Sequence, residues 1–84
     1  MATILERVIE VVEKRLANGK PVTASTSFVD DLGADSLDLT ELIMDLEDEF
    51  GTSGKSLDIP DEVALEIKNV QATVNYLKAL GLED

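Results

Sequence analysis

Residues 30–50 have the sequence DDLGADSLDLTELIMDLEDEF, and this stretch decides the fold. A helix is predicted to start at Asp35–Ser36 and to end near Phe50, with Gly51 as its stop. Spacings of three and four residues, at about 100° per residue, place one apolar stripe on this helix. The predicted core stripe consists of Leu39, Ile43, Leu46 and Phe50, with Leu42 alongside.

The residues before this stretch predict one more helix and a long loop. The helix is expected from Ile4 to Asn18, because Thr3 and Glu6 fit a capping box and Gly19 suits a helix stop. Its apolar stripe comprises Leu5, Val8, Ile9, Val12 and Leu16. Residues 19–34 are rich in turn-forming Pro, Thr and Ser, and so predict a loop. We expect the apolar residues Phe28, Val29 and Leu32 to fasten this loop to the core.

The residues after Phe50 predict a connection and two further helices. Residues 51–58 (GTSGKSLD) are rich in Gly and Ser, which favours a flexible connection. A short helix is expected to begin at the Ile-Pro-Asp-Glu run of residues 59–62, and a last helix is expected over Val70–Leu80, with Asn69 as its cap and Gly81 as its stop. The predicted fold class is all-α: a single domain over residues 1–84, with a small bundle of three longer helices, a short third helix and a long first loop.

Composition excludes several classes of function. The chain has 84 residues, a formal net charge of −11, and neither cysteine nor histidine. Disulfides, Cys/His zinc sites and Ser-His or Cys-His catalytic pairs are therefore impossible, and no metal site is expected. So acidic a chain repels nucleic acid and anionic membranes, and its expected partners carry basic patches. The charged N-terminal residues and the absence of a membrane-spanning stretch predict a cytoplasmic protein, and an organellar protein after removal of its transit peptide would have the same features. We expect a monomer.

Ser36 is the candidate for chemistry, because it lies at the predicted start of the second helix. A serine there is commonly a helix cap. However, Asp35 can cap the helix itself, with Asp38 at the third helical position, and that arrangement would leave the Ser36 hydroxyl free. Backbone N–H groups and the helix dipole favour phosphate at such a position, so both interpretations stay open.

The predicted second helix also carries a strongly acidic face. Nine acidic residues and no basic residue lie between Asp30 and Gly54. Leu37 and Met44 lie two turns apart on a face that also holds Glu41 and Asp48. This face is either a solvated surface that aids solubility or a recognition surface, and the two apolar residues could instead belong to the core.

Taken together, these motifs resemble the acyl carrier protein family. The similarity rests on the run DLGADSLD at residues 31–38, on residues 41–50, on the Ile-Pro-Asp-Glu run, and on Val-Gln-Ala at residues 70–72. It covers nearly the whole chain. The resemblance implies a carrier without catalytic activity, on which a phosphopantetheinyl transferase attaches the 4′-phosphopantetheine of coenzyme A to the serine that corresponds to Ser36.

The resemblance further implies that the thiol of the arm carries acyl groups as thioesters between acyl-transfer, condensing, reducing and dehydrating enzymes of fatty-acid synthesis. Acidic residues would steer the carrier toward basic patches on these partners, with weak and salt-sensitive contacts. The predicted docking residues are Asp35, Leu37, Asp38, Glu41, Met44, Asp45, Glu47 and Asp48. The predicted acyl-chain pocket is lined by Leu46, Ile59, Leu65 and Ile67.

Residues 51–58 depart from the family pattern, because far fewer residues usually separate the second helix from the Ile-Pro-Asp-Glu run. The extra residues are either a tolerated surface insertion or a change in cargo access. A carrier of polyketide, amino-acid or D-alanyl groups stays open as an alternative. Outside the carrier class, the alternatives are an acidic helical cation-binding protein and an inhibitor of a basic enzyme. An EF-hand fails because Asp35 stands where the calcium loop needs glycine.

Overall fold

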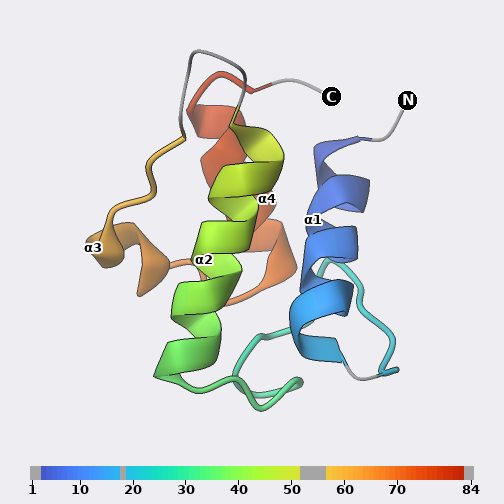
Figure 1. Ribbon diagram of the computed structural model, residues 1–84. Coiled ribbons are helices and arrows are strands. Elements are labelled where there is room, and N and C mark those ends of the chain that lie inside the picture. The colour runs from blue at the N-terminus through green and yellow to red at the C-terminus, as the bar shows by residue number, and fades with distance from the viewer. Residues whose placement is uncertain (1–2, 18, 52–56, 83–84) are drawn as a thin grey trace.

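The computed structural model describes residues 3–17, 19–51 and 57–82 and shows an all-α bundle (Figure 1). Four α-helices and a π-helical turn lie in this part of the chain, which contains no strand. They are α1 (Ile4–Val12), the π-helical turn η1 (Glu13–Ala17), α2 (Ser36–Phe50), α3 (Asp61–Ala64) and α4 (Val70–Ala79). The expected all-α class is therefore confirmed, with three longer helices and one short one.

Helix α1 begins as its sequence predicts and ends differently. Thr3 and Glu6 form the reciprocal capping box, each side chain accepting a hydrogen bond from the other residue's N–H. The α-helix stops at Val12 and continues as the wider π-turn, whereas an α-helix up to Asn18 was expected; Asn18 itself lies outside the described residues. Leu16 of this turn is buried in the core, and Arg15 of the same turn reaches the carboxylates of α2.

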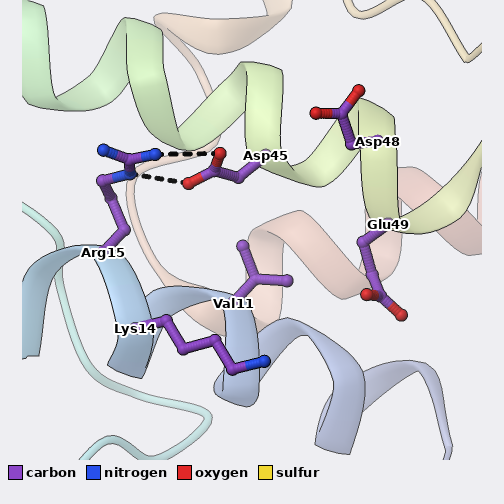
Figure 2. A pocket seen from close by; sticks show the side chains of 6 residues that line it. All are labelled: Val11, Lys14, Arg15, Asp45, Asp48 and Glu49. Atoms are coloured by element: carbon purple, nitrogen blue, oxygen red, sulfur yellow. Dashed lines mark hydrogen bonds and ion pairs between the residues drawn. The ribbon is translucent and has the colours of Figure 1, made fainter.

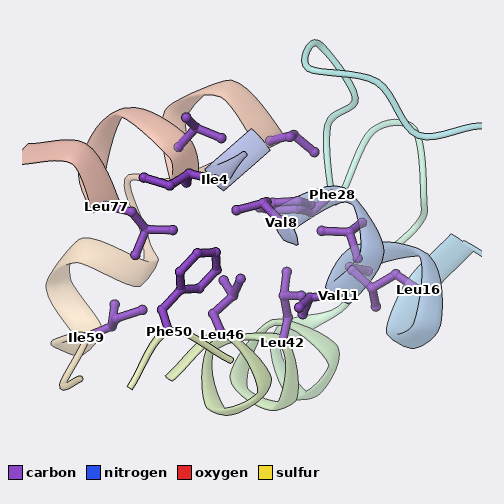
Figure 3. Packing of buried hydrophobic residues seen from close by; sticks show 14 residues of the cluster. Ile4, Val8, Val11, Leu16, Phe28, Leu42, Leu46, Phe50, Ile59 and Leu77 are labelled. Carbon is purple, nitrogen blue, oxygen red and sulfur yellow. The ribbon is translucent and has the colours of Figure 1, made fainter. Parts of the chain in front are cut away.

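Helix α1 packs against both α2 and α4, and their inward faces form one apolar core (Figure 3). The helices contribute aliphatic side chains, and the two phenylalanines come from the long loop and from the end of α2. The largest fully buried side chains are Phe28, Ile4, Leu42, Leu46, Leu77, Val8, Val12, Val70 and Thr73.

The set of buried residues on α2 differs from the predicted core stripe. Leu42, Leu46 and Phe50 are buried, at steps of four residues, and they face the core. Leu39 and Ile43 are only half-buried and pack at the rim of the core. The prediction of a core stripe through Leu39 and Ile43 is therefore wrong in part, because both side chains also border the open space between α2 and α3.

The long loop is fastened to the start of α4 by backbone hydrogen bonds. The Phe28 N–H donates to the Lys68 carbonyl at 3.1 Å, and the Val70 N–H donates to the Thr26 carbonyl at 3.2 Å. Phe28 is buried, as expected, but Val29 is 52% exposed, so its predicted role in the core is wrong. The chain turns tightly over residues 27–32, and the side chain that follows the inward Phe28 is therefore turned outward.

The C-terminal part contains the short α3 and the helix α4. Helix α3 has a single turn, which agrees with a short third helix held by packing. Asn69 caps α4 as predicted, because its side chain accepts from the Ala72 N–H at 2.8 Å. Helix α4 ends at Ala79, one residue before the expected end, and Gly81 follows with a φ of +98°. The connection of residues 51–58 lies largely outside the described residues.

The helices of the described segments are too short, or too polar, to span a bilayer.

Candidate functional site

The site is built at the N-terminus of α2, where Asp35 rather than Ser36 is the cap. The Asp38 N–H donates to Asp35 Oδ1 at 2.9 Å, and the Asp35 N–H donates to Asp38 Oδ2 at 3.1 Å. Ser36 is the first residue of the helix and is exposed. Its hydroxyl makes no hydrogen bond to the residues that the structure describes. The interpretation of Ser36 as the capping residue is therefore wrong.

The surroundings of Ser36 fit an attached phosphate. The first N–H groups of a helix lack acceptors within the helix, and the helix dipole adds partial positive charge there. The carboxylates of Asp35 and Asp38, which would repel a phosphate, each accept a hydrogen bond in the capping box. Gly33, with a φ of +69° and open space around its α-carbon, turns the chain just before the helix. A pendant group at the Ser36 oxygen therefore has open access to solvent.

Ser36 also borders an open cavity of about 540 Å³ between α2 and α3. One wall comes from α2 and includes Leu39, Ile43 and Met44. The opposite wall comes from the segment around α3. The full lining is Ser36, Leu39, Thr40, Ile43, Met44, Glu47, Asp58, Ile59, Ala64 and Leu65.

A second cavity, of about 330 Å³, adjoins the first. It lies between the turn of residues 27–30 and the residues that follow α3. Leu39, Ala64 and Leu65 line both cavities. The apolar space beside Ser36 therefore continues past these three side chains toward Val29 and Ile67.

The four residues predicted to line an acyl pocket fall in different places. Ile59 and Leu65 line the first cavity, and Leu65 and Ile67 line the second. Leu46 lines neither cavity, because it is fully buried in the core beneath α2. Its step-of-four spacing to Leu42 and Phe50 already indicated this placement.

Most wall residues of these cavities were not predicted from the sequence as pocket residues, among them the apolar Leu39, Ile43 and Ala64. Leu39 and Ile43 were assigned to the core stripe, and helical spacing did not set them apart from its buried members.

The outer face of α2 presents its two apolar side chains to solvent. Leu37 is 64% exposed and Met44 is 58% exposed, so neither belongs to the core. Asp48 follows Met44 by four residues, is exposed, and has no ion-pair or hydrogen-bond partner among the described residues. These three side chains form an exposed row that is apolar at one end and acidic at the other.

The remaining carboxylates of α2 are largely engaged within the protein. Arg15 donates to both carboxylate oxygens of Asp45, at 2.6 and 3.0 Å (Figure 2). It also donates to Glu41 at 2.6 Å. Arg7 pairs with Glu49 at 2.9 Å and lies over the Phe50 ring. Glu47 accepts the Ile59 N–H at 2.8 Å and so ties α2 to the segment before α3.

The charge state of Arg15 follows from this arrangement. Its hydrogen bond to Asp45 raises the pKa of the guanidinium above its ordinary value, and the charges of Asp45, Glu41 and Asp38 act in the same direction. Arg15 therefore stays fully charged across the physiological pH range. The sequence did not indicate this pairing, because Arg15 and Asp45 are thirty residues apart.

The described residues contain no group of three or more acidic side chains placed to hold a metal ion.

Comparison with protein families identifies the class to which this fold and site belong. The chain matches the family described as phosphopantetheine attachment site over residues 3–77. This match covers most of the chain, so the protein belongs to this family of carrier proteins. It is a non-catalytic carrier that bears a covalent 4′-phosphopantetheine group. Carriers of this family are modified by phosphopantetheinyl transferases and interact with the enzymes of a pathway.

Proposed function

We propose that the protein is an acyl carrier protein of fatty-acid synthesis or a related lipid pathway, with its 4′-phosphopantetheine attached to Ser36. The observation that carries the proposal is the exposed Ser36 hydroxyl, left without a partner because Asp35 caps the helix. Membership of the carrier family decides against an acidic cation-binding protein or an enzyme inhibitor.

Attachment requires an accessible hydroxyl on a rigid element. A transferase forms a bond between Ser36 Oγ and the phosphorus of the pantetheine phosphate of coenzyme A. The pyrophosphate bond of coenzyme A breaks, adenosine 3′,5′-bisphosphate leaves, and the serine proton passes to solvent or to a base of the transferase. The attached group supplies a thiol that carries acyl chains as thioesters, which this cysteine-free chain cannot do itself. The protein's part is to hold Ser36 at the helix end and to present it.

The adjoining cavities support a fatty-acyl cargo. Burial of apolar area is worth about 0.8 kcal/mol for each CH₂ group, so a chain that enters the apolar space beside Ser36 gains stability with every carbon covered. Aliphatic side chains of α2 and of the α3 segment form much of the lining of this space, together with the polar Thr40, Glu47 and Asp58. We propose that Ile59, Leu65 and Ile67, together with Leu39 and Ile43, shelter part of the cargo. The originally predicted Leu46 lies behind this wall.

The cavity assignment predicts a pattern of NMR shifts on acylation. Compared with the unacylated phosphopantetheine form, an octanoyl form should shift the methyl signals of Leu39, Ile43, Ile59 and Leu65. The methyl signals of Val8, buried in α1, serve as the control and should move less, because α1 does not pack against α3 in the part of the chain that the structure describes. Unchanged signals at all four cavity residues would contradict the assignment.

We propose that partners dock on the exposed side of α2. The docking surface is the set named from the sequence, namely Asp35, Leu37, Asp38, Glu41, Met44, Asp45, Glu47 and Asp48. Leu37 and Met44 provide a small apolar contact close to Ser36, and the surrounding acids attract basic patches. Such a contact is small and salt-sensitive, which suits a carrier that must leave each enzyme.

The acyl forms present in the cell test the type of cargo. Intact-mass analysis of the protein purified from its own host should show phosphopantetheine forms with saturated, 3-hydroxyl and unsaturated fatty-acyl additions. These are the groups that reducing and dehydrating enzymes interconvert. A population dominated by aminoacyl, D-alanyl or polyketide additions would contradict the fatty-acid role and leave the carrier class intact.

A further inference from the structure

The acids of the docking surface differ in how far they are already neutralised. Arg15 extends from the π-turn η1 and holds Asp45 with two hydrogen bonds and Glu41 with a third. Asp48, one turn beyond Asp45, has no partner among the described residues. Part of the acidic face of α2 is therefore occupied by a cation of the same chain.

The ion pairs of Arg15 with Glu41 and Asp45 are exposed enough for another cation to replace Arg15. Arg15, Glu41 and Asp45 are all partly exposed, with 32–40% of each side chain accessible. Exposed ion pairs contribute little to stability because water and salt screen them. An arginine on a docking partner offers the same forked geometry, and it can replace Arg15 on either carboxylate.

We propose that Arg15 is an internal competitor for the basic docking patches of partner enzymes: it occupies Glu41 and Asp45 and so weakens docking at the side of α2 that faces α1. The inference rests on the proposed docking role of α2. The partner must either displace Arg15 or bind through the exposed row of Leu37, Met44 and Asp48. Arg15 thereby helps the carrier to leave each enzyme.

Lys14 provides a matched comparison within the same groove. It is adjacent in sequence, carries the same charge and lines the same cavity beside Asp45 and Asp48 (Figure 2). It makes no ion pair with the residues that the structure describes. Removal of either cation changes the net charge equally, but only removal of Arg15 frees Glu41 and Asp45.

The first test measures binding of a basic probe, octa-arginine, by NMR titration at 50 mM salt. Arg15→Gln should bind about threefold more tightly than the wild type, a change of the size expected for release of exposed ion pairs. Lys14→Gln should show a clearly smaller gain. Arg15→Lys should lie between the wild type and Arg15→Gln, because lysine keeps the charge but cannot form the fork. Equal affinities for Arg15→Gln and Lys14→Gln, or weaker binding by Arg15→Gln, would overturn the inference.

A double-mutant cycle tests the same point at Asp45. Asp45→Asn should weaken binding of octa-arginine more in the Arg15→Gln background than in the wild type, by about threefold. The same factor in both backgrounds would contradict competition by Arg15. Circular dichroism of each variant checks that the fold is kept, because partial unfolding would also free carboxylates for octa-arginine.

A parallel measurement separates this inference from the proposed function. We also measure the initial rate at which a broad-specificity phosphopantetheinyl transferase loads each variant from coenzyme A. This rate should rise from the wild type through Arg15→Lys to Arg15→Gln. A wild-type protein that binds octa-arginine as predicted but gains no phosphopantetheine would contradict the proposed function alone. A wild-type protein that is loaded normally, with Arg15→Gln no different from Lys14→Gln in either assay, would contradict the competition alone.

Discussion

Replacement of Ser36 by alanine is expected to abolish modification completely. After incubation with coenzyme A and a broad-specificity transferase, the wild type should gain the mass of one phosphopantetheinyl group, and Ser36→Ala should gain none. The change removes only the oxygen that forms the new bond. Asp35 still caps α2 through the Asp38 N–H, so the variant should keep the fold and the thermal stability of the wild type.

Ser25→Ala is the matched control for this experiment. Ser25 is also exposed, but it lies in the long loop and its hydroxyl contacts that of Thr23 at 3.2 Å. The Ser25→Ala protein should be loaded as fast as the wild type. A mass gain by Ser36→Ala would move the attachment point elsewhere and overturn the site described above.

Replacement of Leu46 by alanine is expected to cost the largest share of stability of any change considered. Leu46 is fully buried in the core, where it lies beside Phe50 and Leu42 of the same helix (Figure 3). A leucine-to-alanine change at such a site costs about 3 kcal/mol, the sum of lost burial and of a cavity that only partly collapses. A small domain has a total stability of about 5–15 kcal/mol, so the variant should unfold at much lower urea concentration.

Leu65→Ala is the comparison for Leu46→Ala, because the two residues were predicted to line the same pocket. Leu65 is 75% exposed, and its truncation should change the free energy of unfolding by no more than about 0.5 kcal/mol. Urea unfolding, monitored by circular dichroism, measures the free energy of unfolding of both variants. Equal stabilities of the two variants would contradict the placement of Leu46 in the core and of Leu65 at the cavity wall.

Local sequence signals predicted the starts of the three longer helices well. The capping box at Thr3, the cap at Asp35 and the cap at Asn69 each depend on residues three positions apart, and the structure contains all three. The same local patterns allowed Ser36 to be either the helix cap or a residue with a free hydroxyl. The hydrogen bond from Asp38 to Asp35 decides between them in favour of a free hydroxyl.

Features that depend on distant residues were not predictable in the same way. Arg15 neutralises two acids of α2, and this pairing across the groove follows from the packing of α1 on α2. Val29 was assigned to the core because it is apolar, but the tight turn faces it outward. Leu39 and Ile43 form a cavity wall because α3 is short and leaves the space beside α2 open.

The most direct measurement of the central claim is fragment mass spectrometry of the modified protein isolated from its own host. The peptide that contains residues 31–50 should carry 4′-phosphopantetheine, and the fragment ions should place the group on Ser36. A group placed on any other hydroxyl, or a wholly unmodified peptide from actively growing cells, would contradict the account.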